Sequence, residues 1–125
     1  YDLSGGEQQR LALAKVMVSN PDILLLDEPT KGLDPFFKQT LGRILRSLCK
    51  ENKTIFMVSH DIEFCAEFGD RCSMFFDGEI ATSGSAKEFF SGNNFYTTVE
   101  NKLTRKWCEG IITGEEARTW IRSLL

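Results

Sequence analysis

One short stretch constrains the fold more than any other: residues 23–28 read Ile-Leu-Leu-Leu-Asp-Glu, and a proline follows at once. Four bulky apolar residues bounded by turn-forming residues predict a strand buried on both faces, the kind found inside a parallel sheet. In such sheets, ligands bind beyond the carboxyl ends of the strands. Asp27 and Glu28 lie at such an end. Because side chains alternate along a strand, one acid can face a metal ion and the other a water molecule.

A helix is expected immediately before this strand. Ser4 and Glu7 have the spacing of a capping box, which predicts that Ser4 is the N-cap. Leu11, Ala14 and Val18 follow at spacings of three and four, so we expect them to share one apolar face of this helix, with Met17 alongside.

The next elements predict strand–helix–strand alternation. A second helix is expected from Pro35, a residue favoured at the first helical position, to a terminator at Asn52. Residues 54–58 predict a second buried strand, which ends at a polar cluster containing His60. This order predicts an α/β fold with a mostly parallel sheet and right-handed crossovers. The apolar stripe of the second helix consists of Phe37, Leu41, Ile44, Leu45 and Leu48.

Smaller elements are expected after residue 60. Asp61 is expected to cap a short helix, and Asp77-Gly78 is a strong hairpin signal between strands at 71–76 and 79–82. Two more capping boxes predict helices that begin after Ser85 and Thr113. Residues 91–106 show no clear period.

Composition excludes several classes of protein. The chain has 125 residues, 42% hydrophobic and 26% charged, so we expect one domain at most. Its net charge of −3 and its scattered basic residues argue against non-specific nucleic-acid binding. Its apolar runs are far shorter than the ~20 residues of a membrane span, and we see no signal peptide, so a cytosolic location is expected. The four cysteines have no metal-site spacing and predict reduced, mostly buried thiols.

Taken together, these pieces resemble the carboxyl-terminal half of an ATP-binding-cassette (ABC) ATPase. Residues 3–7 resemble the signature motif of that family, residues 23–28 its Walker B motif, residues 32–34 its D-loop and His60 its switch histidine. Four such motifs in this order are highly specific, with Asp34 seven residues after Asp27 and His60 thirty-three after it. The resemblance covers roughly residues 1–90.

The resemblance implies a partial P-loop NTPase fold with flanking helices and a C-terminal β-hairpin. We expect residues 1–91 to form the half-domain and residues 92–125 a helical extension. Residues 88–92 and 95–98 resemble, more weakly, the C-terminal tail of energy-coupling-factor transporter ATPases. Those proteins drive uptake of vitamins or transition-metal ions.

The family resemblance also implies roles for single residues. Asp27 would help to hold Mg²⁺, and Glu28 would be the general base that deprotonates the attacking water. His60 would donate a hydrogen bond to the γ-phosphate of ATP, and Asp34 would lie at a dimer interface and couple two sites.

A further phosphate site is expected at the start of the first helix. Ser4, Gly5 and Gly6 offer unpaired backbone N–H groups and a hydroxyl at a helix N-terminus. By resemblance, this site serves in trans the ATP that a second nucleotide-binding domain holds. Glu7 stands where many members of the family carry Gln, and its charge would oppose a phosphate.

The implied function is that of an ATP-binding subunit fragment of an ABC-type membrane transporter, coupling ATP hydrolysis to uptake of a vitamin or metal ion. Its partners would be a second nucleotide-binding domain and a transmembrane subunit. The protein would be located at the cytoplasmic face of the cell membrane. Two alternatives stay open: a soluble ABC-type ATPase outside transport, and a non-catalytic half-domain that acts as an interaction module.

The sequence contains no G-x-x-x-x-G-K-[ST], the loop that cradles the β- and γ-phosphates. We therefore expect the isolated 125-residue chain to bind MgATP negligibly and to be inactive as an ATPase. Isothermal titration calorimetry checks this expectation. Saturable binding with a micromolar dissociation constant would contradict it.

The missing loop also predicts self-association. In the sheet order of the family, the strand at residues 54–58 lies between the Walker B strand and the P-loop strand, so here it presents an open hydrophobic edge. Such edges recruit other chains, and we expect domain swapping or edge-to-edge dimers. Light scattering at high protein concentration tests this, and a clean monomer would count against it.

Overall fold

The computed structural model describes residues 4–93 and 96–125. Leu3 of the signature-like motif and Phe95 of the tail-like segment therefore lie outside the described residues. The chain divides into two compact units, Tyr1–His60 and Asp61–Leu125.

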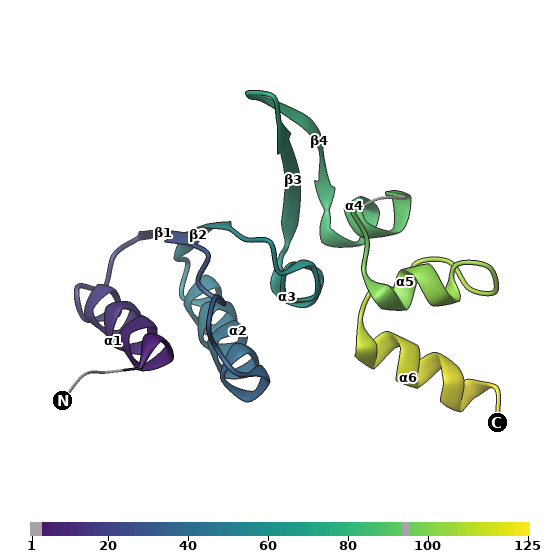
Figure 1. Ribbon diagram of the computed structural model, residues 1–125, viewed down its shortest axis with the longest axis horizontal. Helices are drawn as coiled ribbons and strands as arrows, with labels where there is room; N and C mark the ends of the chain where they lie inside the picture. Colours follow the sequence, from purple (N-terminus) through teal and green to yellow (C-terminus); the bar gives the residue numbers. More distant parts are fainter. Residues whose placement is uncertain (1–3, 94–95) are drawn as a thin grey trace. The chain divides into compact units, whose positions relative to one another are not determined.

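The first unit is built on a two-stranded parallel sheet. Its elements are α1 (Gly5–Val18), β1 (Ile23–Asp27), α2 (Pro35–Lys50) and β2 (Thr54–Val58). β1 pairs with β2 in register, with Leu24 opposite Ile55 and Asp27 opposite Val58. Both helices lie on the same side of this sheet (Figure 1). The expected α/β alternation with parallel strands is confirmed.

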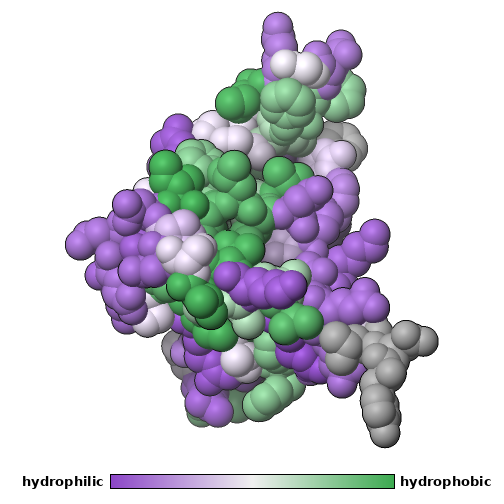
Figure 2. Space-filling model, turned by 90° about the vertical axis from the view of Figure 1, so that its left-hand side faces the viewer, coloured by the Kyte–Doolittle hydropathy of each residue, from purple (hydrophilic) through white to green (hydrophobic). Residues whose placement is uncertain are grey.

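Only one face of this sheet is covered by the described residues. Leu24 is 2% exposed, whereas the next residue, Leu25, is 77% exposed and Phe56 on β2 is 63% exposed. The expectation that the strands are buried on both faces is therefore wrong for this part of the chain, because both helices pack on one side. Hydrophobic side chains gather visibly at the surface in Figure 2 instead of being scattered singly.

The packed face of α1 shares only Met17 with the expected one. The capping box between Ser4 and Glu7 is confirmed. The half-buried residues are Gly6, Gln9, Leu13 and Met17, while Leu11, Ala14 and Val18 are exposed. Apolar residues lie nearly all round this helix, so their periodicity could not select the face that packs.

α2 follows the prediction closely. Pro35 occupies its first position, and the side chain of Asp34 caps it. Leu41 and Leu45 from the apolar stripe are buried. Asn52 ends the helical segment with a φ of 63°, a conformation that Asn tolerates better than most residues.

The second unit combines a hairpin with four short helices among its described residues. These elements are α3 (Ile62–Phe68), β3 (Arg71–Phe76), β4 (Glu79–Ser85), α4 (Ala86–Gly92), α5 (Val99–Thr104) and α6 (Gly114–Ser123). The hairpin and the capping boxes that open α4 and α6 are confirmed. The core of this unit is formed by Ala66, Ala86, Phe90 and Ile112.

α5 lies in the segment that showed no period. Thr98 caps it, and the side it buries is polar: Thr98, Asn101 and Thr104 are all nearly inaccessible. A helix that buries threonine and asparagine leaves no apolar stripe in the sequence.

None of the four cysteines forms a disulfide, and all four are half-buried, so they are more exposed than expected. Within residues 4–93 and 96–125, no helix has the length and apolar character needed to cross a bilayer.

Adjacent leucines on β1 give a matched test of the one-sided sheet. We expect Leu24→Ala to lower the free energy of unfolding by about 2–5 kcal/mol, because it opens a cavity under both helices. Leu25→Ala should change it by less than about 0.5 kcal/mol, because its side chain is exposed. Urea denaturation measures both, and equal losses would contradict the one-sided packing.

Candidate active site at the strand ends

The parallel pairing of β1 and β2 brings two candidate residues together. Both strands end at the same edge of the sheet, and the backbone N–H of Glu28 donates to the carbonyl of Val58 at 2.8 Å. Glu28 follows β1 directly, and His60 lies two residues after β2. As a result, Nε2 of His60 lies 3.7 Å from Oε1 of Glu28.

The carboxylate of Glu28 has an unused acceptor. Its side chain is 28% exposed, but its Oε1 is buried and accepts no hydrogen bond from the described residues. The 3.7 Å gap to the fully accessible His60 imidazole is too long for a hydrogen bond. A buried acceptor without a donor is costly, so this atom favours binding of a donor from outside the chain, such as a water molecule.

The backbone of Glu28 turns sharply at this point. Its φ is 46°, in the left-handed region that residues with a Cβ rarely adopt. Its carbonyl accepts the N–H of Lys31 at 3.0 Å, and the intervening Pro29 and Thr30 are buried. The turn separates the two acids: Asp27 is exposed, whereas most of Glu28 is covered.

The carboxylate of Asp27 is suited to be a single protein ligand of Mg²⁺. No group of three or more His, Cys, Asp or Glu side chains converges within the described residues. Mg²⁺ at phosphate sites is held by one or two carboxylates together with phosphate oxygens and waters, so a dense cluster is not required. The exposed strand-end position of Asp27 suits this arrangement.

The two glycines at the start of α1 have different surroundings. A Cβ on Gly6 would lie 3.2 Å from the carbonyl oxygen of Gly32, so α1 packs closely against the loop before α2. Among the described residues, nothing lies within 4 Å of the equivalent point on Gly5. Gly6 therefore serves contact within the unit, and Gly5 leaves the helix start open.

The hydroxyl of Ser4 is already engaged. It donates to Oε2 of Glu7 at 2.7 Å, and the backbone N–H of Ser4 donates to the same oxygen at 2.9 Å. These hydrogen bonds, that of the Ser4 hydroxyl first, lower the pKa of Glu7 and keep its carboxylate charged. The Ser4 hydroxyl can donate a hydrogen bond to a phosphate oxygen only if the Glu7 carboxylate first turns away.

Asp34 has a structural role that its motif did not indicate. Its Oδ1 accepts the backbone N–H of Phe37 at 2.9 Å and so caps α2. An Asp directly before Pro35 is the sequence signal for this role. Gly32 in the same loop has a φ of 73°, a conformation that favours glycine.

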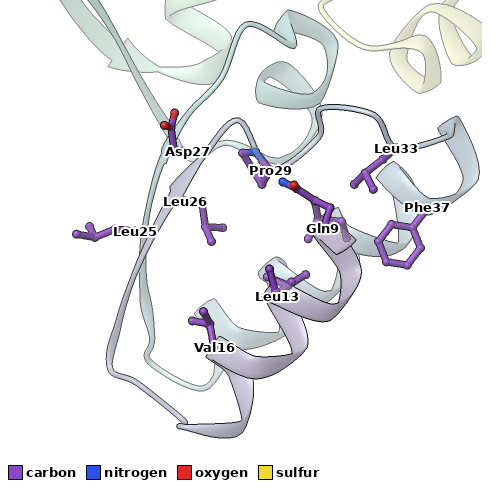
Figure 3. A pocket seen from close by; sticks show the side chains of 11 residues that line it. Gln9, Leu13, Val16, Leu25, Leu26, Asp27, Pro29, Leu33 and Phe37 are labelled. Carbon is purple, nitrogen blue, oxygen red and sulfur yellow. The ribbon is translucent and has the colours of Figure 1, made fainter. Parts of the chain in front are cut away.

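Sequence reasoning missed Gln9. Its Nε2 donates to the carbonyl oxygen of Glu28 at 3.3 Å, across the interface between α1 and the strand end. Figure 3 shows its amide reaching toward the loop that holds Pro29, at the rim of an apolar hollow of about 140 Å³. In the same view Leu26 points toward α1 and Leu25 to the other side of the strand. No pattern in the sequence marks this contact.

The comparison with known proteins begins with the sequence profile of the ABC transporter family, which matches residues 1–31. An ABC transporter ATP-binding protein of Bacillus thuringiensis subsp. konkukian is 53% identical over 93% of this chain and 21% of its own length. The phosphate import ATP-binding protein PstB of Mycobacterium intracellulare is 42% identical over 79% of the chain. The energy-coupling factor transporter ATP-binding protein EcfA2 of Mesomycoplasma hyopneumoniae is 39% identical over 82%. The chain spans only about a fifth to a third of the length of these relatives.

Two solved structures share the fold. A dimeric ATP-binding cassette in a post-hydrolysis state, bound to ADP and Pi, matches 67% of this chain and 36% of its own at a TM-score of 0.64 and 36% identity. CbiO1 of Clostridium perfringens, part of the ABC transporter complex CbiONQ, matches 84% of this chain and 41% of its own at a TM-score of 0.64 and 31% identity. The fold is that of an ABC-type P-loop NTPase, and all three comparisons support a fragment of an ABC transporter ATP-binding domain.

Proposed function

We propose that these residues supply the general base and the signature motif of an ATP-binding subunit in an ABC-type membrane transporter. One observation carries the proposal: Oε1 of Glu28 is buried without a donor, beside His60, where two parallel strands end. A general base needs such an acceptor, because it must take a proton from water.

Each residue has one task in the proposed reaction. Glu28 orients the attacking water through Oε1 and accepts its proton. His60, which is free to turn because its side chain is exposed, donates a hydrogen bond to the terminal phosphate. Asp27 would hold Mg²⁺, which when bound would supply positive charge against the phosphates.

A second domain completes the site. The open start of α1 at Gly5 faces the ATP of a partner nucleotide-binding domain, with Asp34 near the contact between the two domains. The dimeric cassette that shares this fold supports the arrangement. The phosphate-cradling loop, which does not occur among the 125 residues, comes from other residues of a subunit several times longer, as the lengths of the relatives suggest.

The finer assignment concerns the cargo. The tail-like segment near residues 88–98, the EcfA2 relative and the CbiO1 neighbour support an energy-coupling-factor transporter that takes up a vitamin or a metal ion. In this arrangement a transmembrane subunit binds the ATPase at the cytoplasmic face of the membrane, and no nucleic acid is involved.

Replacing the general base tests the proposal. In the full-length protein, we expect Glu28→Gln to lower the kcat for ATP hydrolysis by about 10²- to 10⁴-fold, because the amide cannot accept the proton. ATP binding should change little, since the shape of the side chain is kept. A coupled ATPase assay and nucleotide titration measure the two quantities.

Glu51→Gln is the matched control, because Glu51 is exposed in the same unit and lies outside the candidate site. It should leave the rate unchanged. A Glu28→Gln variant that hydrolyses ATP at the wild-type rate would overturn the proposal.

A further inference from the structure

Gln9 links α1 to the catalytic loop. Its side chain is half-buried, and its Nε2 donates to the carbonyl oxygen of Glu28 at 3.3 Å, nineteen residues along the chain. Among the pocket-lining side chains in Figure 3, its amide reaches from α1 toward the turn after Asp27.

Gln9 bonds to the backbone of Glu28, a residue with an unfavourable backbone conformation. Glu28 has a φ of 46°, which persists in a residue with a Cβ only when neighbours fix it. Three hydrogen bonds meet its backbone: its N–H to Val58, the Lys31 N–H to its carbonyl, and the Gln9 amide to the same carbonyl. The Gln9 bond is the one of these three that comes from α1.

α1 is itself tied to the loop before α2. Gly6 lies against the Gly32 carbonyl, where an added Cβ would come within 3.2 Å. One turn further on, the guanidinium of Arg10 lies 5.0 Å from the centre of the Phe37 ring. The contacts of Gly6 and Arg10 therefore tie the first turns of α1 to the loop before α2 and to the start of α2.

We propose that Gln9 is a positioning residue: its amide holds the Glu28 carbonyl, and through it couples the start of α1 to the orientation of the catalytic carboxylate. Gln9 does not touch the reacting atoms. The inference rests on the proposed function, because it needs Glu28 to act on water and the start of α1 to face a nucleotide. It adds a route by which occupation of one nucleotide site sets the geometry of the other.

Two variants remove the donor while keeping the length of the side chain. Gln9→Met is neutral, and Gln9→Glu replaces the donor by a charge that repels the carbonyl. In the full-length protein, we expect both to lower kcat for ATP hydrolysis by roughly 10- to 100-fold, the cost of a misplaced catalytic group. The KM for ATP should change by less than about threefold, because binding contacts are kept.

Gln39→Met and Gln39→Glu are the matched controls, because Gln39 is exposed on α2 and lies outside the site. They should leave kcat unchanged, and thermal melting of all four variants confirms folding. If one Gln9 variant does not fold, the other decides the result.

Hydrogen exchange gives a readout that does not depend on activity. The backbone N–H of Lys31 shares the Glu28 carbonyl with Gln9, so we expect exchange in a peptide spanning residues 28–33 to be roughly two- to tenfold faster in Gln9→Met. If the wild-type protein is active and a folded Gln9 variant shows the wild-type kcat or the wild-type exchange rate, the role of Gln9 is overturned. An inactive wild-type protein would instead overturn the proposed function itself.

Discussion

The candidate site depends on the in-register parallel pairing of β1 and β2. Asp27 pairs with Val58, and the Glu28 N–H donates to the Val58 carbonyl, so the residues after each strand meet at one edge. Because side chains alternate along a strand, a slip of one residue would send the hydrophobic set to the other face of the sheet. The burial of Leu24 under the helices therefore also fixes where the carboxylate and the imidazole lie.

A second constraint is the left-handed backbone of Glu28. It places two consecutive acids in different surroundings, Asp27 exposed and Glu28 largely covered with an acceptor free. This division matches the needs of a metal ligand and a general base. The conformation is held by the strand on one side and by α1 on the other, so the helix that carries the signature-like glycines also supports the turn that carries the proposed general base.

Sequence reasoning recovered what short-range chemistry determines. The three capping boxes, the first residue of α2 and the Asp77-Gly78 hairpin were all predicted, because each depends on residues within one turn. The meeting of Glu28 and His60 could be anticipated from the rule that parallel strands end at the same edge. The packed face of α1 could not, because its apolar residues surround the helix. α5 was missed because it buries polar side chains, and the Gln9 contact because a side-chain bond to a distant carbonyl leaves no trace in spacing.

The most direct test of this account is a crystal structure of the full-length protein with Mg²⁺ and a non-hydrolysable ATP analogue. The account predicts that a water molecule lies between Oε1 of Glu28 and the terminal phosphate, with His60 contacting that phosphate and Asp27 at the metal. A nucleotide bound with its terminal phosphate remote from the ends of β1 and β2 would contradict it.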